Sequence, residues 1–115
     1  MTDILVCVPK ARWADWVGEG DPAGTEWSGD FEYVYSVRTA PDIKPGERVY
    51  IAALGKLRGY APLVRVDRTS HGFGLVRRGG AVAVTIPEPV RGFPGWRVRW
   101  WDRGAEMPFP DWRRP

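Results

Sequence analysis

Proline and glycine recur so often along this chain that they leave little room for long helices. The 115 residues include 11 prolines and 14 glycines, spread over most of the length. Proline lacks a backbone N–H group and glycine readily adopts turn conformations, so both residues interrupt regular elements. Their spacing predicts one domain, residues 1–115, made of short strands joined by turns, with one or two small helices.

Hydrophobic periodicity indicates where these elements lie. A continuous apolar run predicts a buried first strand at 3–8, and Trp13, Trp16 and Val17 have the spacing of one face of a short helix. Later strands are predicted at 31–37, 47–54, 60–67 and 96–101, and one or two strands at 75–86 around a Gly-Gly turn. A turn is predicted at 41–46, a tight connection at 54–59 and a polar loop at 68–74. Pro62 predicts an edge or a bulge in its strand. Six or seven short strands favour a mainly β fold, either a small barrel or a half-open sheet.

Charge is distributed unevenly between the two halves of the chain. Residues 1–57 contain 6 basic and 9 acidic side chains, whereas residues 58–115 contain 11 basic and 5 acidic ones. All the basic residues of the second half are arginines. A basic C-terminal half predicts a face for an anionic partner such as nucleic acid.

The sequence offers little for metal, cofactor or hydrolytic chemistry. Cys7 and His71 are the only cysteine and histidine, which argues against thiolate or histidine-rich metal sites. The stretch GKLRG lacks Walker spacing, and GEGDPAG is not a dinucleotide fingerprint. His71 is the only base available to a Ser-His-Asp triad, and Ser70 beside it is poorly placed as its nucleophile. We therefore expect no cofactor, no metal and no catalytic residue.

The location of the protein is predicted from three absences. No run of about 20 apolar residues is long enough to span a membrane. The N-terminal MTDILVCVPK has the pattern of a strand and not of a signal peptide, and a lone cysteine forms no internal disulfide. These features predict a cytoplasmic protein without a membrane partner.

The last predicted strand, WRVRWW, combines three tryptophans with two arginines. Side chains of a strand alternate between two faces, so Trp96, Val98 and Trp100 would form a core stripe. Arg97, Arg99 and Trp101 would then form a basic row on the opposite face. That row suits phosphate contact and base stacking. The alternative is a solvated arginine face whose aliphatic stems cover neighbouring side chains.

Residues 37–66 carry a resemblance to a known family. Arg38 follows a predicted strand, then come Pro45-Gly46-Glu47, a hydrophobic strand at 49–51, and Gly59-Tyr60-Ala61. This order resembles the PUA-like superfamily, in particular its ASCH and EVE branches, over about a quarter of the chain. The resemblance implies a small mixed β-barrel, a pseudobarrel of five to six strands with short helices. It also implies a cleft for RNA, for a modified or flipped nucleobase, or for a related ligand.

The chain departs from the ASCH pattern at two charged positions. That family has Lys and Glu ahead of its Arg, and Tyr33 and Ser36 stand there in this chain. The resemblance therefore fits binding better than the amidohydrolase activity of some relatives, which needs groups for proton transfer. The residues expected to bind nucleic acid or a base are Trp13, Trp16, Trp27, Tyr33, Arg38, Arg58, Tyr60, Arg77, Arg78, Arg97, Arg99 and Trp101.

Three of these residues have a further reason. Arg58 is expected in a tight turn beside Tyr60, and Arg77 and Arg78 precede Gly79-Gly80, where exposed N–H groups meet phosphate.

Three functions remain open from the sequence. The first is a non-enzymatic binding module for RNA or a modified base, with single strands preferred over duplex because no helix has a groove-reading face. The second is a protein-interaction or accessory factor, of a phage type for example, which would use the aromatic, proline-rich tail. The third is a small nucleoside amidohydrolase on the same fold. An arginine-rich, lysine-poor composition fits a bacterial or phage source.

Overall fold

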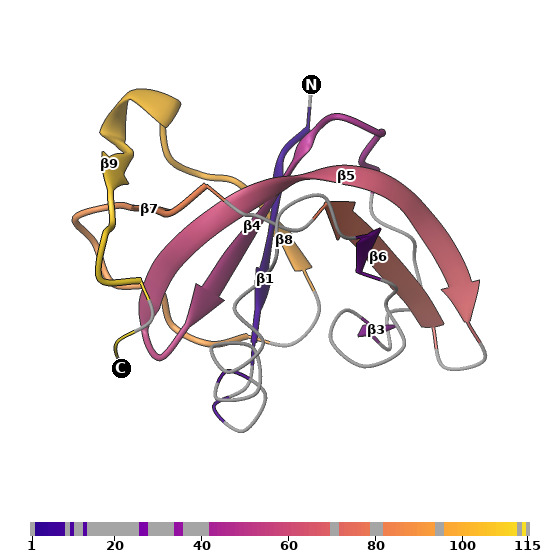
Figure 1. Ribbon diagram of the computed structural model, residues 1–115, viewed down its shortest axis with the longest axis horizontal. Coiled ribbons are helices and arrows are strands. Elements are labelled where there is room, and N and C mark those ends of the chain that lie inside the picture. Colours follow the sequence, from indigo (N-terminus) through magenta and orange to yellow (C-terminus); the bar gives the residue numbers. More distant parts are fainter. Residues whose placement is uncertain are drawn as a thin grey trace.

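The computed structural model is built mainly from β-strands (Figure 1). It describes residues 2–8, 10, 13, 26–27, 34–35, 42–69, 72–78, 82–93, 96–112 and 114. The strands are β1 (Ile4–Cys7), β2 (Glu26–Trp27), β3 (Val34–Tyr35), β4 (Arg48–Ala53), β5 (Lys56–Thr69), β6 (Gly72–Arg78), β7 (Val84–Thr85), β8 (Trp96–Val98) and β9 (Met107–Pro108). A 3-10 turn, η1, covers Arg103–Ala105, and Lys10 and Trp13 have helical backbone conformation.

One mixed sheet organises the fold. β1 pairs with β4 in parallel and with β8 antiparallel, and β4 pairs with β5 antiparallel. The long β5 arches across the molecule and continues into a second pairing with β6, which also pairs with β2 and β3 (Figure 1). β7 and β9 form a separate two-stranded sheet. The hydrogen-bonded path among the described strands runs from β2 to β8 and does not close into a barrel.

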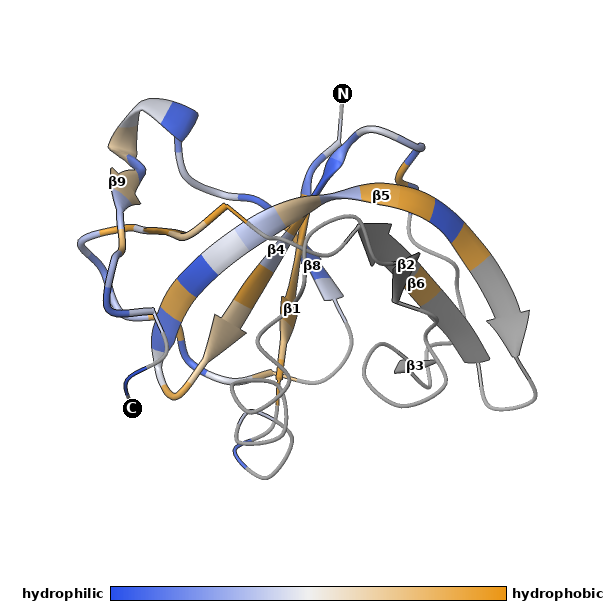
Figure 2. Ribbon diagram, in the orientation of Figure 1, coloured by the Kyte–Doolittle hydropathy of each residue, from blue (hydrophilic) through white to orange (hydrophobic). Residues whose placement is uncertain are grey.

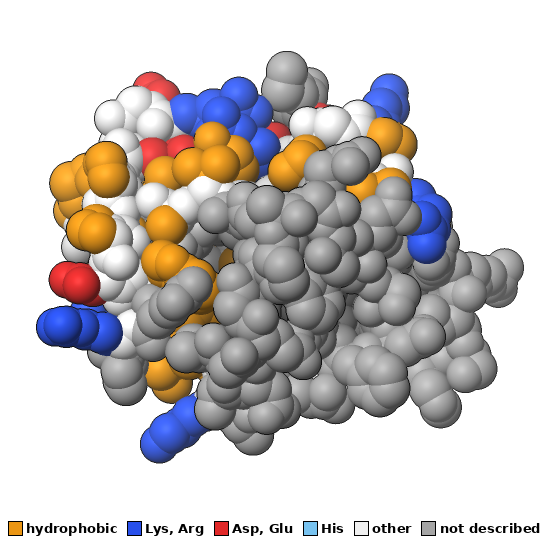
Figure 3. Space-filling view, viewed as in Figure 1, with side chains coloured by type: hydrophobic (Ala, Val, Ile, Leu, Met, Phe, Trp, Pro, Cys, Tyr) orange, Lys and Arg blue, Asp and Glu red, His pale blue; other side chains and the backbone are white. Residues whose placement is uncertain are grey.

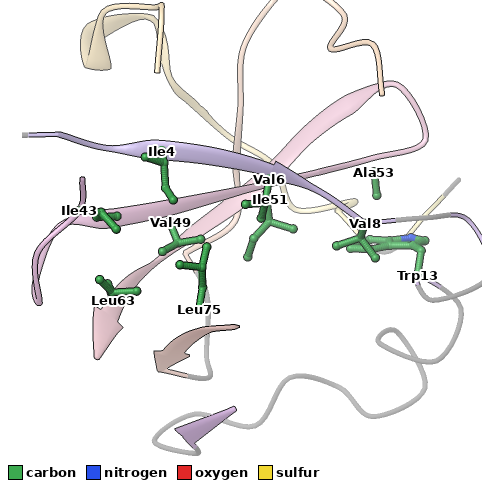
Figure 4. Close-up of a cluster of buried hydrophobic side chains, with 10 residues drawn as sticks. All are labelled: Ile4, Val6, Val8, Trp13, Ile43, Val49, Ile51, Ala53, Leu63 and Leu75. Atoms are coloured by element: carbon green, nitrogen blue, oxygen red, sulfur yellow. The ribbon is translucent and has the colours of Figure 1, made fainter. Parts of the chain in front are cut away.

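The central sheet is covered on both faces. On one face, β1 and β4 contribute to a cluster of Ile4, Val6, Val8, Trp13, Ile43, Val49, Ile51, Ala53, Leu63 and Leu75 (Figure 4). On the other face lies a cluster of Leu5, Tyr50, Ala52, Leu57, Ile86, Val90 and Trp101. The predicted strand at 3–8 is confirmed, and its unbroken hydrophobic run is explained because both of its faces are buried (Figure 2).

Two turns have backbone conformations that can be compared with the preferences of their residues. Lys44 accepts a hydrogen bond at 3.0 Å from the N–H of Glu47, with Pro45 and Gly46 between them. Gly46 has a φ of 89°, as the third position of a type II turn demands, so the predicted turn is confirmed. The β4–β5 hairpin turns at Leu54 and Gly55, whose φ angles are 52° and 78°. Both values are positive, as in the type I′ turns that suit two-residue hairpins.

Strand β5 differs from the prediction in its length and its irregularities. Arg58 lies inside this strand and not in a tight turn, and it is the extra residue of a bulge opposite Ile51 and Ala52. A second register shift falls between Leu63 and Arg65, directly after Pro62, which confirms the predicted bulge. The polar loop predicted at 68–74 is wrong, because β5 runs to Thr69 and β6 begins at Gly72.

No helix within the described ranges is both long and apolar enough to cross a membrane.

Candidate nucleic-acid interface

Arginine and aromatic side chains meet at the surface beside β8. Arg97 is exposed, and its guanidinium carbon lies 4.6 Å from the centroid of the Phe93 ring. Phe93 is half-buried and packs against the core that contains Leu5, and Arg91 nearby in sequence is exposed. A guanidinium resting on an aromatic face is held in place while its N–H groups stay available to an anion.

Trp100, three residues after Arg97 in the sequence, has an exposed indole. The residue is 46% exposed, and its Nε1–H donates a hydrogen bond of 3.1 Å to Oε1 of Glu88. Its ring meets Trp101 edge to face, with centroids 5.1 Å apart and an interplanar angle of 89°. These two contacts fix the indole, and a fixed exposed indole is a suitable surface for base stacking. We call Arg91, Phe93, Arg97 and Trp100 the arginine–aromatic patch.

A second stacked arginine lies on the same face of the sheet. Leu5 pairs with Arg97 on one side and with Tyr50 on the other, so these three side chains share a face, together with Arg48. The guanidinium carbon of Arg48 is 4.0 Å from the centroid of Tyr60. Its Nη1 donates to Oη of Tyr50 at 3.0 Å and to Oε1 of Glu106 at 3.2 Å. Arg48 is thereby held flat against an aromatic ring, as Arg97 is.

A buried carboxylate gathers the other arginines of this face. The side chain of Asp3 is 2% exposed, and its Oδ2 accepts hydrogen bonds from Nε of Arg99 at 3.1 Å and from Nη2 of Arg103 at 2.7 Å. Its Oδ1 accepts the backbone N–H of Arg48 at 3.0 Å. Burial alone raises the pKa of Asp3, but the hydrogen bonds from Arg103, Arg48 and Arg99 outweigh it and hold the pKa below its usual value.

Glu106 forms the second acidic centre. Its Oε2 accepts the hydroxyl of Tyr50 at 2.5 Å and the indole N–H of Trp101 at 3.0 Å. Tyr50 is fully buried, and this burial, reinforced by the hydrogen bond to Glu106, raises the pKa of Tyr50 to about 12. Tyr50 therefore serves as a neutral donor that orients Glu106 toward Arg48.

The raised pKa of Tyr50 predicts a loss of stability at alkaline pH. In the unfolded chain the phenol ionises near its ordinary value of 10.0, whereas in the folded protein it ionises only at about 12. Protons are therefore bound more tightly by the folded state, and the contribution of Tyr50 to stability falls as the pH rises from 10 to 12. We expect Tyr50→Phe to lower the free energy of unfolding at pH 8 and to flatten its decline above pH 10. Urea denaturation of both proteins across this pH range measures the difference, and an unchanged slope would contradict it.

Three arginines and two carboxylates thus form one network on this face. Arg48, Arg99 and Arg103 are paired with Asp3 and Glu106, and their side chains are 26%, 24% and 37% exposed. Figure 3 shows Lys and Arg side chains gathered with acidic ones beside them on the upper part of one face. The network orients partly exposed guanidinium groups, which is the chemistry needed to contact a phosphate backbone.

Burial corrects the predicted positions of three residues. Trp101 shares a face with Arg97 and Arg99 as predicted, but it is 7% exposed and packs against Tyr50, so its predicted place on an exposed row is wrong. The reason is that the C-terminal segment covers this face of the sheet as well. Trp13 at 4% and Arg58 at 2% are also buried, so neither presents a surface for a ligand in this structure.

Arg99, which contacts Asp3, lies on the face of Arg97 as predicted, and Tyr60 lies on the same face opposite Tyr50, a position that the sequence did not predict. Val98, which was predicted in the core stripe, is 53% exposed, and Trp100 is exposed too. Trp96 packs against the cluster that contains Ile4 and Val6. β8 ends at Val98, so the alternation of side chains between two faces does not extend to Trp100.

For the remaining predicted residues, the structure describes either the backbone alone or nothing. Trp27 in β2 pairs with Arg77 in β6, and the next pair in the register is Glu26 with Arg78. The structure therefore brings Trp27, Arg77 and Arg78 to one strand pair, which the sequence did not predict. Trp16, Tyr33 and Arg38 lie outside the described residues.

Sequence reasoning missed five arginine and aromatic residues of the interface: Arg48, Arg91, Phe93, Trp100 and Arg103. Arg48 begins a hydrophobic strand and Phe93 lies in a Pro-Gly loop, so neither position suggested a site. Trp100 was assigned to the core by strand alternation. A local signal existed for Trp100, because Asp102 caps the 3-10 turn that follows it and thereby ends the strand pattern.

No cluster of three or more histidine, cysteine, aspartate or glutamate residues suited to a metal ion occurs in the described part of the chain. Comparison with protein-family models, with curated proteins and with solved structures found no match.

Proposed function

We propose that the protein is a non-enzymatic module that binds RNA or a modified or flipped nucleobase. The observation that carries the proposal is the arginine–aromatic patch. Arg97 lies on the Phe93 ring, and Trp100 presents an exposed indole three residues away. Guanidinium groups contact phosphates and indoles stack on bases, so the patch combines the two interactions that single-stranded nucleic acid offers.

Electrostatics supports the same partner. The arginine–aromatic patch and the paired Arg48, Arg99 and Arg103 lie in or beside the face of the sheet that contains Leu5 and Tyr50. The C-terminal half carries 11 arginines against 5 acidic residues. An excess of arginine over acidic side chains attracts a polyanion over distances near the Debye length of about 10 Å.

We further propose that the fold is of the PUA-like type, a pseudobarrel related to the ASCH and EVE domains. The arched β5, which joins two sheet segments, and the type II turn of Pro45 and Gly46 support this assignment. Gly59 supports it too, because a side chain there would meet the backbone of Val82.

The test is a fluorescence titration with a short single-stranded RNA, and with the same sequence as DNA, at low and moderate salt. We expect the double variant Arg97→Ala/Trp100→Ala to weaken RNA binding about tenfold or more, since each stacked base contributes roughly 1–3 kcal/mol. The salt dependence should also fall by about one phosphate contact. Val98→Thr, which alters an exposed side chain between the two positions, is the matched control and should bind like the parent protein.

Two results would count against the proposal. Equal RNA affinity of the double variant and the parent would remove the arginine–aromatic patch from the interface. Absence of binding to RNA, DNA and modified nucleosides at low salt would reject the function itself.

A groove favours protein interaction as the second candidate. It measures about 380 Å³ and is lined by Leu54, Pro87, Pro89, Met107, Phe109 and neighbouring residues. Met107 is 44% exposed, although it is apolar. Binding of a protein partner that persists at high salt and is lost in Met107→Asp would favour this function over nucleic-acid binding.

A further inference from the structure

Arg58 is a buried cation whose hydrogen-bond partners are neutral. Its Nε donates to the carbonyl of Ala53 at 3.0 Å, and its Nη1 donates to the carbonyls of Trp112, at 3.0 Å, and of Arg114. Its Nη2 is buried and has no hydrogen-bond partner. Among the described residues no carboxylate pairs with this guanidinium, and burial lowers the pKa of Arg58. Buried charges are normally neutralised by an opposite charge, so this side chain can take an acceptor that the described residues do not supply.

The described C-terminal residues 109–112 and 114, which we call the cap, cover this side chain. The cap begins where the N–H of Phe109 donates to Ala83 at 3.0 Å. After that point the N–H of Trp112 donates to Phe109 and the N–H of Arg114 donates to Asp111, both within the cap. In the described part of the chain, Arg58 is the group outside the cap that binds its carbonyls. A competitor for this guanidinium would remove the hydrogen bonds that link the cap carbonyls to β5, and the packing of Trp112 against Trp13 would remain as a contact to displace.

Aromatic side chains pack beside the guanidinium group of Arg58. The guanidinium carbon of Arg58 is 5.3 Å from the centroid of Trp13, which is 4% exposed. Trp112 of the cap packs edge to face against Trp13, with centroids 5.7 Å apart and an interplanar angle of 77°. Lifting Trp112 exposes an indole next to a cation that has an unused donor.

We propose that Arg58 and Trp13 form a covered site for a small phosphorylated aromatic ligand, such as a nucleoside monophosphate, and that the cap closes this site. A phosphate oxygen accepts stronger hydrogen bonds from a guanidinium than a neutral carbonyl does, so the ligand outcompetes Trp112 and Arg114 for Arg58. The base of the ligand then takes the place of Trp112 against Trp13. This site is separate from the arginine–aromatic patch and does not depend on it.

The test uses calorimetric titration of the full chain with uridine monophosphate, uridine and inorganic phosphate. A closed cap reduces the apparent affinity by the fraction of open molecules. We therefore expect Trp112→Ala to bind uridine monophosphate about tenfold more tightly than the parent does. Trp112→Phe keeps a ring in place and should stay near the parent value. Adding Arg58→Met to Trp112→Ala should abolish the gain. Binding of inorganic phosphate alone would locate the affinity at Arg58, and binding of uridine alone would locate it at Trp13.

Hydrogen exchange of the parent protein provides a second readout. Saturating uridine monophosphate should increase exchange of the backbone amides of Trp112 and Arg114. The proposal is overturned if Trp112→Ala gains no affinity, if the gain survives Arg58→Met, or if exchange in the cap is unchanged at saturation. None of these results depends on Arg97 or Trp100, so they leave the RNA-binding proposal to its own test.

Discussion

Replacing Gly59 by alanine should destabilise the protein by about 3 kcal/mol, through overpacking and through loss of backbone hydrogen bonds. A Cβ at this position would lie 2.6 Å from the carbonyl oxygen of Val82, a backbone atom that cannot rotate away. Val82 is fixed by two backbone hydrogen bonds with Tyr60, of 3.0 and 2.8 Å. Relieving the clash requires these bonds to lengthen and the chain at Val82 to move off β5. Urea denaturation measures the change.

Gly92→Ala is the matched control for this substitution. Gly92 has no atom within 4 Å of the added Cβ and no positive φ. Its replacement should therefore change the stability by less than about 0.5 kcal/mol. A similar small effect at Gly59 would mean that Val82 does not approach β5 in solution.

Asp3→Asn should destabilise the protein by about 3 kcal/mol, because it removes one partner of buried ion pairs. The carboxylate of Asp3 accepts hydrogen bonds from Arg99, Arg103 and the N–H of Arg48. An asparagine removes the negative charge that Arg99 and Arg103 share. We expect the lower end of the usual range, since Arg99 and Arg103 are partly exposed and regain some hydration. Thermal and urea unfolding give the difference directly.

Asp111→Asn tests whether burial is the cause. Asp111 and Arg114 form an ion pair of 3.8 Å whose side chains are 64% and 80% exposed. Removing this charge should alter the stability by less than about 0.5 kcal/mol. Comparable effects at Asp3 and Asp111 would show that the network around Asp3 is no stronger than a surface pair.

The same carboxylate predicts an acid limit to stability. The pKa of Asp3 in the folded protein lies below its ordinary value of 3.8, so its stabilising contribution is complete above pH 3.8. That contribution falls as the pH drops through the lowered folded-state pKa, because protonation breaks the pairs with Arg99 and Arg103. The Asp3→Asn protein should lose less stability than the parent below pH 3.8.

Local features of the fold followed from the sequence. The apolar run at 3–8 predicted β1, and the Pro45-Gly46 pair predicted the turn before β4. Both depend on near neighbours, since strand pattern and turn dihedrals are properties of a few consecutive residues. The hairpin at Leu54 was less clear, because a non-glycine residue with a φ of 52° is uncommon.

The sequence predicted which types of residue form the candidate site, but not which individual residues belong to it. The arginine excess of the second half indicated a basic surface, and Arg97 and Arg99 were assigned to one face correctly. Trp101 was placed on that face too, yet it is buried beside Tyr50. Strand alternation tells which side chains share a face. It does not tell whether another segment covers that face.

What the sequence determined by itself was therefore the class of fold, the position of the strongest strands and the basic character of the second half. The tertiary structure decided which arginines are paired with carboxylates, which are buried and which are exposed at the surface. Asp3 meets Arg99 and Arg103 across 96 and 100 residues of sequence, and Arg58 meets Trp112 across 54. Periodicity and turn chemistry act over a few residues. Burial and charge pairing depend on segments far apart in the sequence that meet when the chain folds around the central sheet.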